Sequence, residues 1–259
     1  MRIKNKFDLT GKVAIITGSS KGIGESIARG LAEFGAKVVV SSRKQDAVDA
    51  VAADFQKDGL EAVGIECHIA KADHRTNLIE KTIEKYGRID ILVNNAGTNP
   101  YYGPIKDMSA DVYQKTMDIN LNAAMELSNL VHPHMLAQGG GSIIHISSIE
   151  GLHATQMMAA YNVSKAGLIM LGKNQAAEWG RENIRVNVIC PGLVKTKLSA
   201  ALFSDEKTNQ KVNRKIPLQR PAMPDEMAGL ACFLASDASS YCTGSVIVND
   251  GGILLAPLF

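Results

Sequence analysis

The sequence predicts an α/β protein built on a parallel β-sheet with helices on both faces. Short, almost wholly apolar runs rich in β-branched residues alternate along the chain with amphipathic stretches of helical length, a pattern typical of successive βαβ units. No linker, internal repeat or low-complexity tract interrupts this alternation, so residues 1–259 are expected to form one domain with a seven-stranded sheet.

The first βα unit has the pattern of a nucleotide-binding turn. A strand is predicted over residues 12–17 and a helix over residues 23–34, and three glycines in the spacing G-x-x-x-G-x-G lie between them. Such glycines let the backbone approach a pyrophosphate, and the helix N-terminus presents free N–H groups to it. The spacing matches neither the usual dinucleotide fingerprint nor the P-loop literally, and the alternative is a plain tight turn. We expect cofactor contacts from Gly18, Ser20, Lys21, Gly22, Ile23 and Gly24.

The end of the second strand, predicted over residues 37–42, indicates which dinucleotide is bound. An acidic residue here would hold a ribose 2′-hydroxyl, but the sequence continues Ser42-Arg43-Lys44. Arg43 and Lys21 are the candidates to bind a 2′-phosphate, with solvated surface charges as the alternative. The sequence therefore favours NADP(H), and NAD(H) remains an alternative.

The alternation continues through the rest of the chain. Further strands are predicted near residues 62–67, 89–93, 142–148, 185–189 and 245–249, and helices near 46–57, 73–86, 109–138, 157–180 and 225–235. The fourth strand runs into Asn94-Asn95-Ala96-Gly97, at the edge of the sheet where ligands bind. Asn120 falls inside the long helical stretch, where an Asn needs a reason. Residues 197–220 are polar and weakly patterned, which makes them a candidate mobile lid.

Chemistry is expected between Ser148 and Lys165. Tyr161 and Lys165 are four apart in a helical stretch, so their side chains lie on one face, and an ammonium near a phenol favours the phenolate. Ser148 follows the fifth strand, where its hydroxyl can polarise a carbonyl. The alternative is a surface helix and an ordinary turn serine.

Composition excludes several other classes. The net charge is +2 with both signs interspersed, which argues against nucleic acid and anionic membranes as partners. The four cysteines form no C-x-x-C pair and the six histidines are scattered, so we expect no disulfide framework and no metal site. No run of eighteen apolar residues suggests a membrane span, and no signal peptide is expected.

With these residues assembled, the chain resembles the short-chain dehydrogenase/reductase family over nearly its full length. The shared motifs occur in order: residues 17–24, Asn94-Asn95-Ala96-Gly97, Asn120, Ser148, Tyr161-x-x-x-Lys165, Pro191-Gly192 and Asp250-Gly251-Gly252. The resemblance implies a doubly wound Rossmann fold, hydride transfer to or from a nicotinamide, a small carbonyl or alcohol substrate, and commonly a homotetramer.

The resemblance also assigns roles. Tyr161 would be the general acid/base and Lys165 would lower its pKa and bind the nicotinamide ribose, while Ser148 would hydrogen-bond the carbonyl. Asn120 would hold a water in the proton relay to Lys165. Further cofactor contacts are expected from Asn94, Ala96, Gly97, Pro191, Gly192, Val194 and Thr196.

One departure concerns the adenine site. The family usually places an Asp after the third strand, whereas this chain has Cys67-His68-Ile69, so we expect His68 and the backbone at Ile69 to hold the adenine. The same residues resemble the branch of NADPH-dependent carbonyl and retinal reductases known as dehydrogenase/reductase member four. Animal members of that branch end in a peroxisomal signal, whereas this chain ends Pro257-Leu258-Phe259, so a cytoplasmic location is expected.

The leading functional hypothesis is an NADP(H)-dependent carbonyl reductase or secondary-alcohol dehydrogenase. A 3-oxoacyl-thioester reductase or a sugar or polyol dehydrogenase is the alternative, because the same triad serves all three. A non-catalytic NADP-binding sensor is a more remote alternative. The candidates for lining the substrate pocket are Tyr101, Glu150, His153, Met158 and Phe203.

Overall fold

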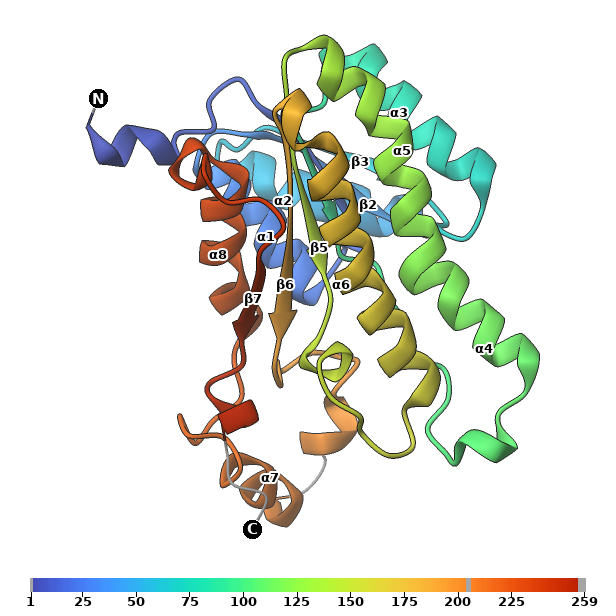
Figure 1. Ribbon diagram of the computed structural model, residues 1–259. Helices are drawn as coiled ribbons and strands as arrows, with labels where there is room; N and C mark the ends of the chain where they lie inside the picture. The colour runs from blue at the N-terminus through green and yellow to red at the C-terminus, as the bar shows by residue number, and fades with distance from the viewer. Residues whose placement is uncertain (1, 204–205, 256–259) are drawn as a thin grey trace.

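A computed structural model describes residues 2–203 and 206–255 and contains one seven-stranded sheet (Figure 1). The strands are β1 (Val13–Thr17), β2 (Lys37–Ser42), β3 (Ala62–Glu66), β4 (Ile91–Asn94), β5 (Gly141–Ile146), β6 (Ile184–Pro191) and β7 (Val246–Asn249). Their order is β3-β2-β1-β4-β5-β6-β7, and every neighbouring pair is parallel. The order reverses between β1 and β4, and in such sheets ligands bind at the carboxyl ends of the strands beside this reversal.

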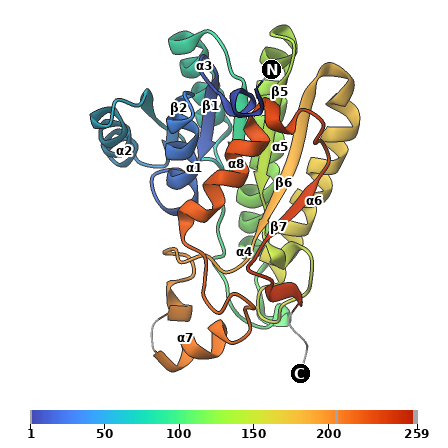
Figure 2. The same ribbon diagram turned by 90° about the vertical axis from the view of Figure 1, so that its left-hand side faces the viewer.

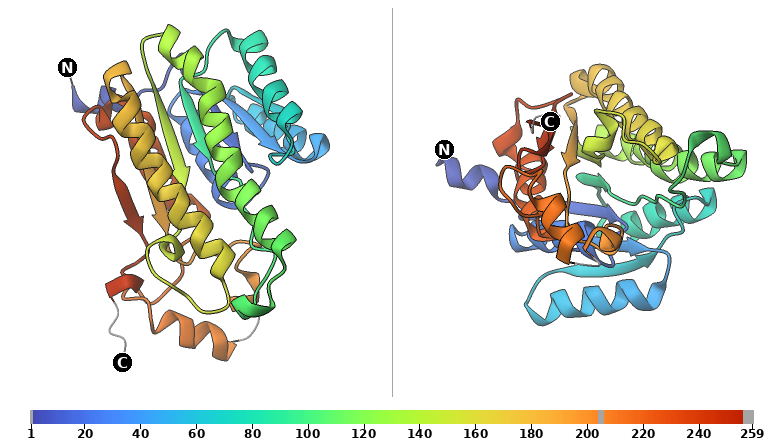
Figure 3. Two further views of the ribbon diagram at one scale, coloured as in Figure 1. Left: turned by 45° about the vertical axis from the view of Figure 1, so that its right-hand side comes forward. Right: turned by 90° about the horizontal axis from the view of Figure 1, so that it is seen from below.

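Helices cover both faces of the sheet, as the sequence predicts (Figure 3). They are α1 (Gly22–Glu33), α2 (Gln45–Lys57), α3 (Ala72–Tyr86), α4 (Ala110–Met117), α5 (Ala123–Ala137), α6 (Ala159–Trp179), α7 (Glu206–Asn213) and α8 (Ala228–Ala235). One core cluster joins the sheet to α1, α2 and α8, and a second joins it to α3, α5 and α6. In β1, Ile16 belongs to the first cluster and Ile15 to the second, which explains why this strand is apolar throughout.

The long helical stretch predicted over residues 109–138 is not continuous. It consists of α4, a π-helical turn over Asp118–Asn122, and α5. The last predicted helix likewise starts as a 3-10 turn, Pro224–Met227, before α8. Such π-helical turns often occur at functional sites, and this one contains Asn120.

The predicted lid projects beyond the carboxyl ends of the strands (Figure 2). It contains a 3-10 helix, Ala200–Phe203, and α7. Its two ends are joined at its base, because the backbone N–H of Lys195 donates to the carbonyl of Ala222 at 2.8 Å. That the segment moves as a lid stays a prediction.

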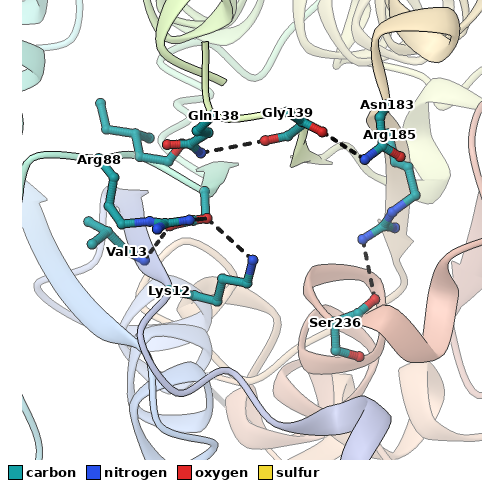
Figure 4. A network of polar contacts seen from close by, with 11 residues as sticks. Lys12, Val13, Arg88, Gln138, Gly139, Asn183, Arg185 and Ser236 are labelled. Carbon is teal, nitrogen blue, oxygen red and sulfur yellow. Dashed lines mark hydrogen bonds and ion pairs between the residues drawn. The ribbon is translucent and has the colours of Figure 1, made fainter. Parts of the chain in front are cut away.

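The opposite edge of the sheet is held by a polar network at the amino ends of the strands (Figure 4). The carboxylate of Asp90 accepts hydrogen bonds from the Val13 backbone at 2.9 Å and from the Arg88 guanidinium at 2.6 and 2.8 Å. Lys12 lies 3.5 Å away. The same region contains hydrogen bonds from Gln138 to Ile89, from Asn183 to Gly139 and from Arg185 to Ser236. This edge therefore has a structural role, remote from the ligand edge.

Within the described ranges, no helix combines the length and the apolar character needed to cross a membrane. The residues Pro257 to Phe259, on which the expectation of a cytoplasmic location rests in part, lie outside the described residues.

Candidate active site

The glycine turn between β1 and α1 forms an open cradle against the end of β4. Gly18 and Gly22 have φ values of 65° and 63°, in the left-handed region that favours glycine. A Cβ at Gly18 would lie 2.9 Å from the Cα of Ala96, and a Cβ at Gly24 would clash with the side chain of Asn95. Only glycine lets the chain pack this closely, so backbone N–H groups line the turn and no side chains fill it.

Three polar residues that the sequence analysis did not select hold this turn in place. The Ser19 hydroxyl donates to the Ile16 carbonyl at 2.6 Å and accepts from the Ser41 backbone N–H at 2.9 Å. The Asn95 amide donates to the Thr17 carbonyl at 2.8 Å, and Thr17 Oγ1 accepts from the Asn95 N–H at 3.1 Å. Their positions at the strand ends were the available signal for this role.

The predicted phosphate-binding cations are free to bind a ligand. Lys21 and Arg43 are both exposed, and neither forms an ion pair with a residue that the structure describes. The Ser19–Ser41 hydrogen bonds hold the turn that carries Lys21 against β2, whose last residue, Ser42, directly precedes Arg43. Both cations therefore come from segments that meet at one end of the cradle.

The adenine-site candidates follow β3. His68 is half-buried, and its Nδ1 atom is buried without a hydrogen-bond partner among the described residues. The carbonyl of Ile69 accepts a hydrogen bond of 2.6 Å from Arg75, which also pairs with Glu126. An unused buried ring nitrogen has hydrogen-bonding capacity available for a ligand.

The segment after β6 closes the other side of the cradle. A Cβ at Gly22 would lie 3.6 Å from the Thr196 methyl group, so Thr196 lies over the start of α1. Ser199 fixes this loop, because its hydroxyl donates to the Val194 carbonyl at 2.6 Å and accepts from the Thr196 N–H at 3.1 Å. Pro191 and Val194 are buried, and Gly192 packs against the backbone of Asp250.

Ser148, Tyr161 and Lys165 come together at the carboxyl end of β5. Ser148 is 8% exposed and forms a side-chain hydrogen bond with Tyr161. Lys165 is 3% exposed; its Nζ atom donates to the Ile146 carbonyl at 2.8 Å and lies 5.6 Å from the centre of the Tyr161 ring. The i, i+4 spacing on α6 thus places both side chains toward the serine, as the sequence predicts.

The electrostatics differ from the expectation that Lys165 lowers the pKa of Tyr161. Burial raises the pKa of Tyr161 to about 12, the hydrogen bond from Ser148 opposes this, and the Glu150 carboxylate adds to it. Burial also lowers the pKa of Lys165 to about 8. The expectation is wrong for the protein alone, because the desolvation of both groups dominates and favours their neutral forms.

Asn120 connects the π-helical turn to the site. Its Oδ1 accepts from the Thr98 N–H at 2.8 Å, and its Nδ2 donates to the Thr98 carbonyl and to Ser164 Oγ, both at 2.9 Å. A Cβ at Gly97 would lie 3.4 Å from Lys165 Nζ and 3.5 Å from Asn120 Oδ1. The glycine therefore leaves the space between these two groups open. That this space holds a relay water stays a prediction.

Asn94 lies elsewhere than expected from a residue lining the cleft. It is 4% exposed, and its amide donates to Ser128 Oγ at 3.2 Å and lies 3.2 Å from His145 Nδ1. His145 Nε2 is 2.8 Å from Gln175 Oε1. The side chain thus joins β4 to β5 and α5, and the neighbouring Asn95, Ala96 and Gly97 are the residues that face the cradle.

The substrate-pocket candidates lie on two loops that meet. The Gly103 N–H donates to the Met157 carbonyl at 3.0 Å, which joins the loop of Tyr101 to the loop before α6. The Tyr101 hydroxyl donates to the Pro104 carbonyl at 3.0 Å, so it is satisfied within its own loop. Glu150, Met158 and Phe203 are half-buried, and His153 is exposed with Nδ1 3.0 Å from the Ile149 carbonyl. Among the residues that the structure describes, no cluster of His, Cys, Asp or Glu is arranged to hold a metal ion.

Comparisons with known proteins agree with this geometry. The family model described as Enoyl-(Acyl carrier protein) reductase matches residues 18–254. The Dehydrogenase/reductase SDR family member 4 of Oryctolagus cuniculus is 43% identical over 244 residues, which cover 94% of this chain and 94% of that relative.

Two solved structures are also closely similar. A gluconate 5-dehydrogenase from Burkholderia cenocepacia J2315, in complex with NADP and tartrate, has a TM-score of 0.94 and 34% identity, covering 99% of this chain and 100% of that one. A 7α-hydroxysteroid dehydrogenase complexed with NADH and 7-oxo glycochenodeoxycholic acid has a TM-score of 0.92 and 37% identity, covering 97% of this chain and 98% of that one.

The fold and the site define an oxidoreductase with a single-domain Rossmann fold. The chain belongs to the short-chain dehydrogenase/reductase family. The resemblance read from the motifs is thereby confirmed, and so is the predicted fold class.

Proposed function

We propose that the protein is an NADP(H)-dependent carbonyl reductase, which in reverse oxidises secondary alcohols, and that Ser148, Tyr161 and Lys165 carry the reaction. The observation that supports this most strongly is the position of Tyr161. It is held protonated between the Ser148 hydroxyl and the Lys165 ammonium, at the carboxyl ends of the strands.

The residues act on the substrate oxygen. The hydroxyls of Ser148 and Tyr161 donate to the carbonyl oxygen and polarise the C=O bond. As the carbonyl carbon gains a hydride, Tyr161 transfers its proton to the oxygen, and the product is the alcohol. The Lys165 charge stabilises the phenolate that remains, and Asn120 is placed to hold a water that returns the proton. In the oxidation direction Tyr161 takes the proton back.

NADP(H), when bound, supplies or accepts the hydride. The cradle fits its pyrophosphate because Gly18, Gly22 and Gly24 leave it open, and the unpaired cations Lys21 and Arg43 fit a 2′-phosphate. The unpartnered His68 nitrogen is suited to adenine. The NADP in the gluconate 5-dehydrogenase structure supports this choice, and the NADH in the hydroxysteroid dehydrogenase structure keeps NAD(H) as an alternative.

Two other substrate classes have support from the comparisons. The family model's description favours a thioester reductase, and the gluconate 5-dehydrogenase favours a sugar or polyol dehydrogenase. A non-catalytic sensor is disfavoured because the triad is complete and correctly assembled.

The test is a set of initial rates for simple ketones, diketones, 3-oxoacyl thioesters and sugars with NADPH and NADH. We expect reduction of ketones or diketones with NADPH at the highest kcat/KM. A clear preference for thioesters would instead assign the protein to the reductases of fatty-acid-type substrates, and no turnover with either cofactor would favour the sensor.

Self-association and a cytoplasmic location are part of the same proposal. Val163 and Met170 on α6 are 47% and 55% exposed, and Met125 on α5 is 40% exposed, so two neighbouring helices present apolar side chains to solvent. The four cysteines are free thiols, which suits a reducing compartment. Light scattering on the purified protein should give the mass of a tetramer, and Met170→Lys should lower it.

A further inference from the structure

Glu150 has a fixed position beside the reacting hydroxyls. Its backbone N–H donates to Ser148 Oγ at 3.1 Å, in the 3-10 turn Ile149–Gly151. This turn is pressed against α6, since a Cβ at Gly151 would lie 2.7 Å from the carbonyl carbon of Lys165. The start of the Glu150 side chain is therefore held within one residue of the Ser148 hydroxyl that binds the substrate oxygen.

The carboxylate of Glu150 lacks the partners that a buried acid normally has. Its Oε2 atom is buried and has no hydrogen-bond partner among the described residues, and no described cation forms an ion pair with it. Asp90, at the other edge of the sheet, has its carboxylate bonded by Val13 and Arg88. A buried carboxylate oxygen without a donor is costly, which indicates that a donor is supplied by a ligand.

Neighbouring groups do not supply that donor. Lys165 Nζ is directed to the Ile146 carbonyl. His153, the nearest imidazole along the loop, has Nδ1 3.0 Å from the Ile149 carbonyl and Nε2 3.2 Å from Thr155 Oγ1. The Glu150 charge acts on Tyr161, whose pKa it helps to raise, so the carboxylate lies close to the reacting atoms.

We propose that Glu150 is a specificity-determining residue that accepts a hydrogen bond from a hydroxyl on the carbon next to the reacting carbonyl. The substrate class is then neutral α-hydroxyketones, with vicinal diols in the reverse direction. An ionised carboxylate is only an acceptor, so it favours a hydroxyl donor and repels a carboxylate in the same place. This inference rests on the proposed carbonyl reductase function and names its substrate class.

The test compares three aromatic ketones that differ only beside the carbonyl: acetophenone, 2-hydroxyacetophenone and benzoylformate. The kcat/KM of each is measured with NADPH for the unmodified protein, for Glu150→Gln and for the control Glu178→Gln, an exposed acid on α6. Ratios to acetophenone remove the intrinsic reactivity of each ketone.

In Glu150→Gln we expect the 2-hydroxyacetophenone ratio to fall about tenfold and the benzoylformate ratio to rise about tenfold, as expected for one hydrogen bond or repulsion involving a charged group. Glu178→Gln should leave both ratios as they are. Ratios that stay unchanged in Glu150→Gln would overturn the role of Glu150 while leaving the carbonyl reductase function intact. No reduction of any of the three by the unmodified protein would overturn that function, and this inference with it.

A second measurement needs no variant. Competitive inhibition of the unmodified protein by 1-phenyl-1,2-ethanediol and by mandelate compares a neutral diol with its anionic analogue. We expect the diol to bind at least about tenfold more tightly. Equal or tighter binding of mandelate would contradict the proposal even if Glu150→Gln failed to fold.

Discussion

The Nζ atom of Lys165 lies 5.6 Å from the centre of the Tyr161 ring and 2.8 Å from the carbonyl oxygen of Ile146. Burial moves the two pKa values toward each other, to about 12 for the phenol and about 8 for the ammonium. The protein alone therefore holds Tyr161 as an acid ready to give a proton, which suits carbonyl reduction. Alcohol oxidation needs the phenolate, so it depends on additional positive charge when the site is loaded.

The first prediction concerns Tyr161. Tyr161→Phe keeps the ring and removes the proton donor, so the kcat of ketone reduction should fall by at least about 100-fold, the usual contribution of a general acid. Binding of NADPH, measured by fluorescence titration, should change little. A variant that reduced ketones at the unmodified rate would show that the proton comes from another group.

The second prediction concerns pH. The Lys165 ammonium stabilises the phenolate formed during reduction, and the pKa of this ammonium is lowered to about 8. The rate of reduction should therefore be constant at neutral pH and decline as pH rises through about 8, whereas Tyr161, with a pKa of about 12, stays protonated over this range. Lys165→Arg should move the decline to higher pH even if it lowers the rate, because a guanidinium keeps its charge. An unchanged decline in Lys165→Arg would assign it to another group.

Much of the fold was readable from the sequence because apolar runs and helical periods survive in a sheet buried on both faces. The seven strands and their helices lie within a few residues of the predicted bounds, and the glycine turn lies where its spacing indicates. The π-helical turn around Asn120 was not predictable, because it depends on bonds to Thr98 and Ser164, which are distant in sequence.

Other features of the site also depend on tertiary environment. The side chain of Asn94 turns to Ser128 and His145, a choice that only the packing of α5 against the sheet determines. The raised pKa of Tyr161 follows from burial, which a sequence does not report. The i, i+4 pattern therefore predicts which groups meet but not their charge states.

The third prediction concerns the cofactor. Arg43 is exposed and unpaired among the described residues, at the end of β2, so its charge is available to a 2′-phosphate. Arg43→Asp replaces a bidentate donor by an acceptor suited to a ribose hydroxyl, and should lower kcat/KM for NADPH by about tenfold or more while raising it for NADH. Lys44→Asp, at the neighbouring exposed position, is the matched control. An unchanged NADPH/NADH ratio in Arg43→Asp would mean that Arg43 does not contact the phosphate.

The fourth prediction concerns stability at the opposite edge of the sheet. Burial raises the pKa of Asp90, but the hydrogen bonds from Arg88 and Val13 and the charge of Lys12 outweigh this and lower the pKa below 3.8. A carboxyl whose pKa is lower in the folded than in the unfolded state stabilises the fold above the unfolded pKa, and this stabilisation is lost as pH falls through the folded value.

Asp90→Asn removes these charge-assisted bonds and should lower the free energy of unfolding by about 1–3 kcal/mol at pH 7. The difference from the unmodified protein should shrink as pH falls below about 4, because the carboxyl is then increasingly protonated in both states of the unmodified protein. Urea unfolding at pH 7 and at pH 3 measures both quantities. Asp54→Asn, in an ion pair with Arg29 whose acidic side chain is 57% exposed, should cost less than about 1 kcal/mol at either pH. Equal destabilisation by Asp90→Asn at both pH values would show that shape, and not the ionised carboxylate, is what this edge of the sheet requires.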